Sequence, residues 1–244
     1  ENCMPSKAMV AYHSAKAKGG AALTIIEAAR THPSGDTGRP AIRAYDPASI
    51  TGYSDLADAC HAHKCKVFAQ LSHPGREMTI AADGSQPVAY APSAIPNERF
   101  HVMPREMPLQ VINQIIKGFA ISADNLRRAG IDGVEIVASH GYLIGQFINP
   151  RINQRTDSFG GSLENRLRFL RKVLKAVRSG AGEKMVVGVR ISGDEKDFGG
   201  IKQDEMIELS KLLGLEVDLD YLSVAAGTSA GLLGSTHIVP PMQY

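Results

Sequence analysis

Short apolar segments alternate with longer amphipathic segments along most of the chain. Five runs of strand length are almost continuously apolar, at residues 22–28, 66–71, 133–139, 185–191 and 221–226. Runs of this kind fit strands that are covered on both faces, as in a parallel sheet. Before and between them, apolar residues recur at helical spacing, at residues 9–18, 50–63, 109–129, 163–177 and 203–213. The pattern therefore predicts strands and helices in alternation.

Local signals at the ends of two segments support these helices. Ser162 stands directly before residues 163–177 as an N-cap candidate, and Gly130 follows residues 109–129 as a stop signal. Repeated strand–helix pairs predict an α/β fold, either a barrel or a doubly wound sheet. No Gly-x-Gly-x-x-Gly follows any of the predicted strands, which argues against a dinucleotide-binding sheet.

Polar residues stand at the C-terminal ends of several different predicted strands. They are Glu27, Gln70, Ser139, His140, Arg190 and Ser223. Active sites of (β/α)8 barrels are built at this end of the strands, so the placement favours a barrel. A complete barrel needs eight strands, whereas the pattern supplies five. We therefore expect an incomplete α/β fold of the TIM-barrel type that forms a single domain over residues 1–244.

Composition and charge narrow the classes of function. Of the 244 residues, 43% are hydrophobic and 21% are charged, which is typical of a globular protein. The net charge is +2 and no stretch concentrates Lys and Arg, so we expect a small-molecule substrate and neither nucleic acid nor a membrane surface. No apolar run reaches the ~18 residues of a membrane span. Three cysteines are too few for a disulfide framework, which favours the reducing cytoplasm.

One long segment, residues 139–166, carries a much more distinctive sequence motif than the rest of the chain. Residues 139–150 read Ser-His-Gly-Tyr-Leu-Ile-Gly-Gln-Phe-Ile-Asn-Pro, and residues 151–166 continue Arg-Ile-Asn-Gln-Arg-Thr-Asp-Ser-Phe-Gly-Gly-Ser-Leu-Glu-Asn-Arg. The segment resembles the flavin-binding barrel of Old Yellow Enzyme, 2,4-dienoyl-CoA reductase and trimethylamine dehydrogenase. Gln-Leu-Ser-His-Pro-Gly-Arg at 70–76 and Val-Arg-Ile-Ser at 189–192 also resemble that family's third and fifth strands. Tight turns and capping account for the conspicuous residues of 151–166, so we expect no catalysis there.

The resemblance implies FMN as cofactor, NAD(P)H as reductant and a flavin site at the barrel mouth. Flavin chemistry needs a donor that stabilises negative charge at the N1 and O2 edge of the ring. Arg190 suits that task because its guanidinium is always charged and forked. Gln70 can both donate and accept, which suits the amide edge of the pyrimidine ring. By resemblance, Gln70 and Arg190 bind FMN together with the backbone of Ala28.

The same resemblance makes His140 and Tyr142 the catalytic candidates. In the family, a pair spaced His-x-x-Asn or His-x-x-His binds a carbonyl oxygen, and a tyrosine two places further on donates a proton. Here Val137 stands at the first position of the pair, so His140 alone is left. Relatives of the trimethylamine dehydrogenase type also keep only the second histidine and oxidise amines. A single histidine is therefore compatible with alkene reduction and with amine oxidation.

Two further features have simpler explanations. His73 and Arg76 follow the third strand, and they either line the substrate side or lie in a surface loop. The segment Cys-His-Ala-His-Lys-Cys at 60–65 packs four potential metal ligands into six residues. Zinc sites usually draw their ligands from pairs that are well separated in sequence, so we expect no metal there.

The leading hypothesis is an FMN-dependent oxidoreductase that passes hydride from NAD(P)H through flavin to an activated alkene, either an enone or an enoyl thioester. The alternatives are oxidative demethylation of a small N-methylated amine and a truncated fragment without catalysis. By resemblance, the first strand would precede Glu1, and the last two strand–helix units, which hold the FMN phosphate, would follow Tyr244. An iron–sulfur cluster, with no ligands in this chain, and C-terminal domains are implied for the full-length protein by the multidomain branch. Open sheet edges favour association, including homo-oligomers.

Overall fold

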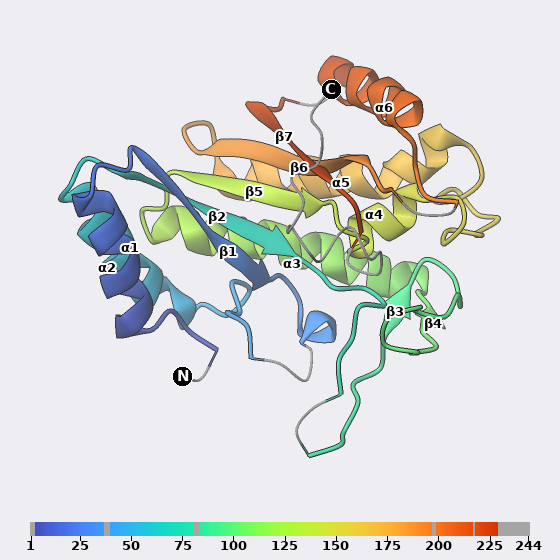
Figure 1. The fold of residues 1–244 in the computed structure, drawn as a ribbon, viewed down its shortest axis with the longest axis horizontal. Coiled ribbons are helices and arrows are strands. Elements are labelled where there is room, and N and C mark those ends of the chain that lie inside the picture. The colour runs from blue at the N-terminus through green and yellow to red at the C-terminus, as the bar shows by residue number, and fades with distance from the viewer. Residues whose placement is uncertain (1–2, 37–39, 81–82, 197–198, 217, 229–244) are drawn as a thin grey trace.

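A five-stranded parallel sheet forms the centre of the protein. The computed structural model describes residues 3–36, 40–80, 83–196, 199–216 and 218–228. The strand order is β1-β2-β5-β6-β7, so the sheet follows the order of the chain (Figure 1). The strand bounds are Leu23–Arg30, Lys66–Ser72, Gly133–Ala138, Val186–Asp194 and Tyr221–Ala226. All five predicted strands are therefore confirmed, with ends that differ by a few residues.

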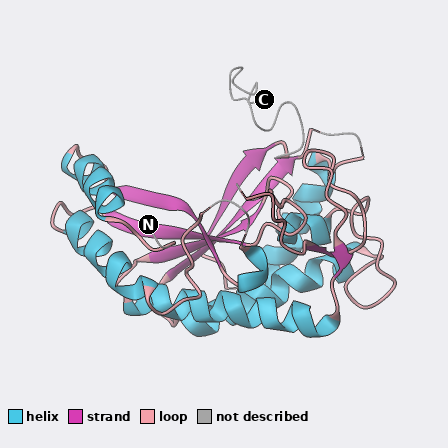
Figure 2. Ribbon diagram, turned by 90° about the horizontal axis from the view of Figure 1, so that it is seen from below, coloured by secondary structure: helices cyan, strands magenta, loops and turns pink. Residues whose placement is uncertain are grey.

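Helices line the outer side of the curved sheet (Figure 2). Their bounds are Lys7–Lys18 for α1, Ser49–His61 for α2, Leu109–Arg128 for α3, Leu163–Ala181 for α5 and Gln203–Glu216 for α6. One apolar core joins the two layers, because side chains of the strands such as Leu71 and Val189 belong to the same buried cluster as Phe119 and Leu170 of the helices. Burial of this apolar surface is the main force that holds helices against sheet.

The sequence signals at two helix ends act as predicted. Ser162 Oγ accepts a hydrogen bond from the Asn165 backbone N–H at 3.3 Å, which satisfies one free donor at the start of α5. Gly130 follows α3 with a φ of 79°, a conformation that side chains rarely adopt. The helices that these signals delimit, α3 and α5, pack against each other on the outer side of the sheet.

The register of the sheet brings polar side chains together at the C-terminal ends of the strands. Gln70 pairs with Glu135, while Arg190 pairs with Val137 on one side and with Ser223 on the other. Successive residues of a strand face opposite sides. These five side chains therefore share the concave side of the sheet, and their chain neighbours face the helices.

Four short elements were not predicted. They are the 3-10 helix η1 at Pro33–Gly35, α4 at Leu143–Ile148, and β3 at Tyr90–Ala91 paired with β4 at Arg105–Glu106. All six residues of α4 are buried, so the segment has no polar face that would mark it as an amphipathic helix. A two-residue strand is too short to show an alternating pattern.

The described part of the sheet is an open arc of five strands, as the sequence predicts for an incomplete barrel. β1 and β7 are its edges, and they carry exposed apolar side chains: Leu23, Ile25, Leu222 and Val224. A closed barrel has no such edges. Among the helices of the described residues, none has the length and apolar character needed to cross a membrane.

Candidate active site

A chain of hydrogen bonds crosses the concave side of the sheet. Gln70 Nε2 donates to Glu135 Oε1 at 2.6 Å, and the Tyr221 hydroxyl donates to Glu135 Oε2 at 3.1 Å. Glu135 is fully buried, so its carboxyl group depends on these donors. Because the amide nitrogen of Gln70 faces Glu135, the amide oxygen of Gln70 points elsewhere and is available to a ligand.

Tyr221 reaches Glu135 by lying across β6 at Gly188. Gly188 pairs with Glu135 on one side and with Tyr221 on the other, and a Cβ at Gly188 would overlap the Tyr221 ring. The ring also stacks on Phe68, with 6.0 Å between the ring centroids. Burial and the neighbouring Glu135 raise the pKa of Tyr221, which keeps its hydroxyl protonated. A glycine inside an apolar strand was the one sequence signal of this close approach.

Arg190 lies beyond Gly188 on the same side of β6, closer to the C-terminal end. Its Nη1 donates to Ser223 Oγ at 3.2 Å, and its side chain is half-buried. Among the described residues, no carboxylate lies within 4.0 Å of this guanidinium. Several of its five N–H donors therefore remain for an anionic or polar ligand.

A β-bulge places Ala28 beside Gln70. Two residues of β1, Glu27 and Ala28, stand opposite the single residue Gln70 of β2. Bulges release backbone groups from the ladder and are frequent next to active sites. The structure thus brings Ala28 and Gln70 together, and Arg190 lies on the same concave side.

β5 ends in a sharp turn at His140. His140 and Gly141 both have left-handed backbone angles, with φ of 59° and 73°. For a residue other than glycine this conformation costs about 1 kcal/mol or more and is concentrated at functional sites. Ser139 Oγ lies 2.7 Å from His140 Nδ1, and the His140 backbone N–H donates to Ser192 Oγ at 3.1 Å. Val137, three residues earlier, is buried and apolar, so this position of the family pair carries no polar group.

Tyr142 follows this turn as the N-cap residue of α4. Its backbone N–H donates to Ser139 O at 3.2 Å, and the next backbone N–H, of Leu143, donates to His73 O at 3.0 Å. The Tyr142 side chain is half-buried and interacts electrostatically with the Arg30 guanidinium. The turn between β5 and α4 therefore sets both catalytic candidates at the C-terminal ends of the strands.

Arg30 is a residue of this region that the sequence analysis missed. It is the last residue of β1, and its Nη1 donates to Ser72 Oγ, its register partner on β2, at 3.2 Å. Burial lowers the pKa of the Arg30 guanidinium, and the Tyr142 and Asp36 side chains partly oppose that shift. The predicted strand stopped at residue 28, which left Arg30 outside the set of strand-end residues.

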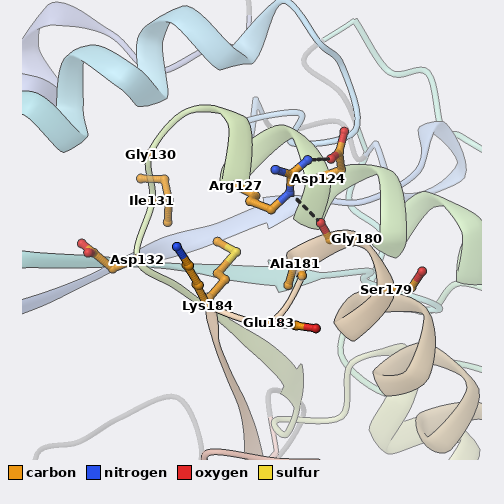
Figure 3. A pocket seen from close by; sticks show the side chains of 12 residues that line it. Asp124, Arg127, Gly130, Ile131, Asp132, Ser179, Gly180, Ala181, Glu183 and Lys184 are labelled. Atoms are coloured by element: carbon orange, nitrogen blue, oxygen red, sulfur yellow. Dashed lines mark hydrogen bonds and ion pairs between the residues drawn. The ribbon is translucent and has the colours of Figure 1, made fainter.

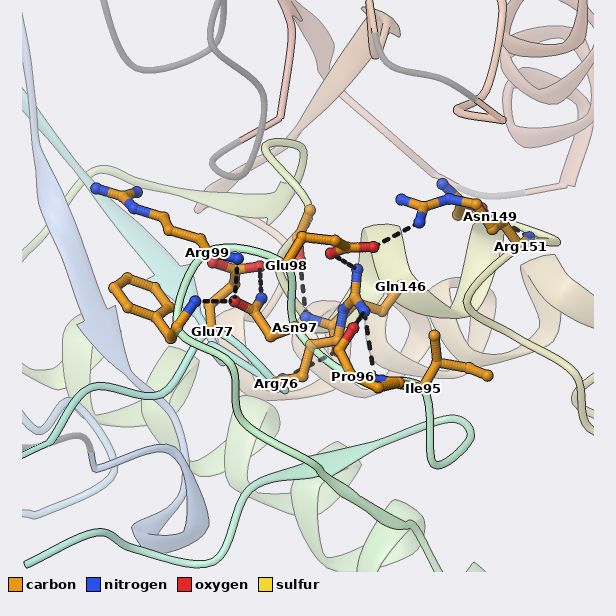
Figure 4. A network of polar contacts seen from close by, with 12 residues as sticks. Arg76, Glu77, Ile95, Pro96, Asn97, Glu98, Arg99, Gln146, Asn149 and Arg151 are labelled. Atoms are coloured by element: carbon orange, nitrogen blue, oxygen red, sulfur yellow. Dashed lines mark hydrogen bonds and ion pairs between the residues drawn. The ribbon is translucent and has the colours of Figure 1, made fainter.

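His73 and Arg76 lie in the interior rather than in a surface loop. His73 Nδ1 accepts from the Gly75 backbone N–H at 3.1 Å, and its Nε2 lies 3.0 Å from Ser34 Oγ. Burial lowers the pKa of His73 to about 3, so the ring is neutral at pH 7 and carries its proton on Nε2. Arg76, 2% exposed, donates to two backbone carbonyl groups and to Glu98 at 2.8 Å (Figure 4).

Arginines also fix the loop of residues 151–166. The Arg155 guanidinium binds Asp157 at 2.6 Å and donates to the backbone carbonyl groups of Pro92 and Met107. Arg166 donates to Glu205 at 2.6 Å. These contacts connect the loop to the segments around it, in line with the structural role expected for it.

A cleft of about 670 Å³ lies at the opposite end of the sheet (Figure 3). It is lined by the last residues of α3 and α5 and by the segments that lead into β5 and β6, including Asp124, Arg127 and Lys184. Barrel active sites form at the C-terminal ends of the strands. This cleft therefore lies away from the candidate active site.

The segment 60–65 also precedes a strand and lies away from the candidate active site. Cys60 and Cys65 are buried free thiols, and His61 Nε2 lies 2.7 Å from Asp132 Oδ2. Within the described ranges, no group of three His, Cys, Asp or Glu side chains is arranged to hold a metal ion.

The open parallel sheet, with its helices on the outer side, is part of an α/β barrel. The chain belongs to the NADH:flavin oxidoreductase / NADH oxidase family, which it matches over residues 1–226. Membership supports FMN as the cofactor and NAD(P)H as its reductant, as the sequence resemblance implied.

Individual relatives span reductases and amine dehydrogenases. The NADH oxidase of Thermoanaerobacter brockii is 36% identical over 224 residues, which are 91% of this chain and 34% of that protein. The N,N-dimethylglycine/sarcosine dehydrogenase of Chromohalobacter salexigens is 33% identical over 244 residues, covering 99% of this chain and 35% of that protein. The structure of 2-naphthoyl-CoA reductase with 2-naphthoyl-CoA aligns with a TM-score of 0.87 at 29% identity, over 94% of this chain and 36% of that one. The chain thus spans about a third of the length of these relatives.

Proposed function

We propose that the whole protein is an FMN-dependent oxidoreductase that transfers hydride from NAD(P)H, by way of the flavin, to an activated alkene. The observation that carries this proposal is the family match over residues 1–226. The likeness to a 2-naphthoyl-CoA reductase supports an unsaturated thioester, or an enone of similar reactivity, as the substrate.

In this proposal, Gln70, Arg190 and the backbone of Ala28 hold the flavin ring. Bound FMN supplies the hydride chemistry, and the protein binds and orients it. The three residues fit the ring in chemical terms. Among the described residues, Arg190 has donors without a carboxylate partner and the Gln70 amide oxygen has no hydrogen-bond partner, and the bulge at Ala28 leaves backbone groups outside the ladder.

His140 and Tyr142 act on the substrate. His140 donates a hydrogen bond to the carbonyl oxygen and polarises the double bond, while Tyr142 donates the proton that completes the reduction. The contacts with Ser139 and Ser192 support this role for His140, because they hold a strained residue in one place. With Val137 in place of a second donor, His140 alone binds the oxygen from this turn.

Oxidative demethylation of a small N-methylated amine is the second candidate. The N,N-dimethylglycine/sarcosine dehydrogenase relative supports it, since the similarity extends over 99% of this chain. A single histidine at the β5 turn also suits an amine, which has no carbonyl oxygen to be held by two donors. In this case the amine, and not NAD(P)H, reduces the flavin.

Anaerobic reduction of the full-length, FMN-containing protein separates the two candidates. The protein is mixed with NADH, NADPH or N,N-dimethylglycine, and flavin absorbance is followed. The proposal predicts reduction by a nicotinamide and reoxidation by 2-cyclohexenone. Reduction by N,N-dimethylglycine without reduction by either nicotinamide replaces the proposal with the demethylase.

Tyr142→Phe tests the assignment of the proton donor. Loss of a positioned acid lowers rates by about 10² or more, so we expect reoxidation by 2-cyclohexenone to slow by about that factor. Reduction by NAD(P)H in the same sample should change much less, because it needs no proton from Tyr142. Tyr12→Phe, on the exposed surface of α1, is the matched control. Equal rates for Tyr142→Phe and the wild type would remove Tyr142 from the reaction.

We also propose that residues 1–244 belong to one domain and that the protein works in the cytoplasm. The single domain is supported by one large apolar core that draws residues from all the main helices and from β1, β2, β5 and β6. The reducing compartment is supported by three free cysteines, two of them buried as ordinary core residues.

A further inference from the structure

Arg30 stands on the concave side of the sheet, among the residues of the candidate active site. Its register partner Ser72 is two positions beyond Gln70 on β2, and therefore on the same side of that strand. Tyr142 is near enough to interact electrostatically with the Arg30 guanidinium. Arg30 therefore lies on the same side of the sheet as the proposed flavin contacts, nearer the C-terminal ends of the strands.

No carboxylate among the described residues pairs with Arg30. Within the described residues, its guanidinium makes one hydrogen bond, to Ser72 Oγ, and the guanidinium Nε is buried without a hydrogen-bond partner. Asp36 is the acidic residue that acts on the Arg30 guanidinium electrostatically. Its carboxylate already binds Arg43 at 2.9 Å and accepts a hydrogen bond from the Tyr45 hydroxyl at 2.8 Å. Burial of a cation without a counter-ion is costly, and a protein that keeps such a group commonly uses it to bind an anion.

The other titratable groups around Arg30 do not supply a negative charge. His73 is buried and neutral, held by the Gly75 N–H and by Ser34 Oγ. His32 shares that serine, with 2.8 Å between its Nδ1 and Ser34 Oγ. Among the described residues, the Arg30 guanidinium is therefore a partly buried cation, and the acidic group that acts on it, Asp36, already binds Arg43.

We propose that Arg30 binds a carboxylate on the substrate, so that the substrate class of this site is a small carboxylic acid. This inference rests on the proposed function, whose site it deepens. A forked guanidinium binds both oxygens of a carboxylate at once, which fixes orientation as well as position. Anchoring at Arg30 would hold the reacting carbon of a short substrate close to Tyr142 and His140. An unsaturated keto acid satisfies this arrangement, and so does an N-methylated amino acid for the demethylase candidate.

Binding of a matched pair of probes tests the inference without any turnover. 4-Oxopentanoate and hexane-2,5-dione have the same heavy-atom skeleton, and differ in that a carboxylate replaces an acetyl group. Calorimetric titration of the full-length holoprotein should give tighter binding of 4-oxopentanoate. The preference is the dissociation constant of hexane-2,5-dione divided by that of 4-oxopentanoate. In Arg30→Met this ratio should fall by about 10- to 100-fold, the range expected for loss of a charge-assisted hydrogen-bonded pair. Arg30→Lys should lose part of the preference, because it keeps the charge and lacks the fork.

Arg128→Met, on the exposed end of α3, is the control and should keep the wild-type ratio. Equal affinity of the wild type for both probes overturns the inference, as does a preference that survives in Arg30→Met. An equal loss of both affinities also overturns it, since that result makes Arg30 a structural residue. Turnover is measured separately with the corresponding alkenes, 4-oxopent-2-enoate and hex-3-ene-2,5-dione. If neither reacts while the binding preference depends on Arg30, the proposed function fails and the anion site stands.

Discussion

Two groups of arginines in this protein differ in their partners. Arg76 and Arg155 lie in loops and Arg166 lies in the first turn of α5, and each binds a carboxylate at 2.6–2.8 Å. Arg30 and Arg190 lie on the concave side of the sheet, and within the described ranges the guanidinium group of each has only a serine hydroxyl as hydrogen-bond partner. The first group connects segments of the chain, whereas the second group has N–H donors that no described residue accepts from.

The difference separates structure from ligand binding. A buried arginine with a carboxylate and backbone acceptors has its charge and its donors satisfied, so its removal leaves other groups unpaired. A half-buried arginine without a carboxylate costs stability until an anion arrives. The two groups should therefore respond in opposite ways to the same substitution.

Arg155→Met should have the largest effect on stability. It removes the contacts with Asp157, Pro92 and Met107 together and leaves the Asp157 carboxylate without its cation. Breaking a largely buried pair in this way costs about 3 kcal/mol. Urea unfolding of the full-length protein should show that loss. Arg168→Met, a half-buried arginine of α5 that binds no carboxylate within 4.0 Å among the described residues, is the comparison and should cost far less.

Gly188→Ala should also destabilise the protein, by about 2 kcal/mol, the usual cost of overpacking. The new methyl group would push the Tyr221 ring away from β6 and break its bond to Glu135. A denaturation curve reports the stability, and ultraviolet difference spectra report the environment of the tyrosine. Gly214→Ala, at a helical position with open space, should stabilise slightly or have no effect.

Arg190→Met should weaken FMN binding by about 10- to 100-fold, the loss expected for a charge-assisted hydrogen bond to the flavin. Titration of the flavin-free, full-length protein with FMN, followed by flavin fluorescence, measures the change. Arg76→Met is the matched control from the other group of arginines. If FMN binding weakens by the same factor in both variants, the claim that Arg190 contacts the flavin is contradicted.

Lowering the pH should destabilise the protein, because His73 takes up a proton more readily in the unfolded chain than in the fold. Its pKa is about 3 in the folded protein, against about 6.5 for an unperturbed histidine, so the unfolded chain binds one more proton between those values. Between pH about 6.5 and about 3, the free energy of unfolding should therefore fall by up to about 1.4 kcal/mol for each unit by which the pH is lowered, on account of this group. His73→Asn should remove that part of the slope, while His63→Asn, at an exposed position, should leave it. Identical slopes for the wild type and His73→Asn would mean that His73 is protonated in the fold.

The sequence predicted the strands, the main helices and the placement of Gln70 and Arg190, because these depend on periodicity and on strand ends. It missed Glu135 and Tyr221, whose importance comes from a contact across three strands that only the register creates. Arg30 was missed because β1 pairs with β2 again after the bulge at Glu27 and Ala28. The strand therefore continues past residue 28, where the apolar run ends.

Burial by distant loops was equally invisible in the sequence. His73 and Arg76 follow a strand, and the sequence leaves open whether they line the substrate side or lie in a surface loop, yet segments far along the chain cover them. Local patterns report which side of a strand is apolar, whereas the partner of a polar residue is set by tertiary structure.

Urea unfolding of flavin-free Arg190→Met tests the central claim most directly. If Arg190 is kept for a ligand at a cost to the apo protein, this variant should be as stable as the flavin-free wild type or more stable by about 0.5 kcal/mol, even though it binds FMN less tightly. A clear loss of stability in the flavin-free variant would contradict the account, because Arg190 would then belong with the arginines that hold the fold together.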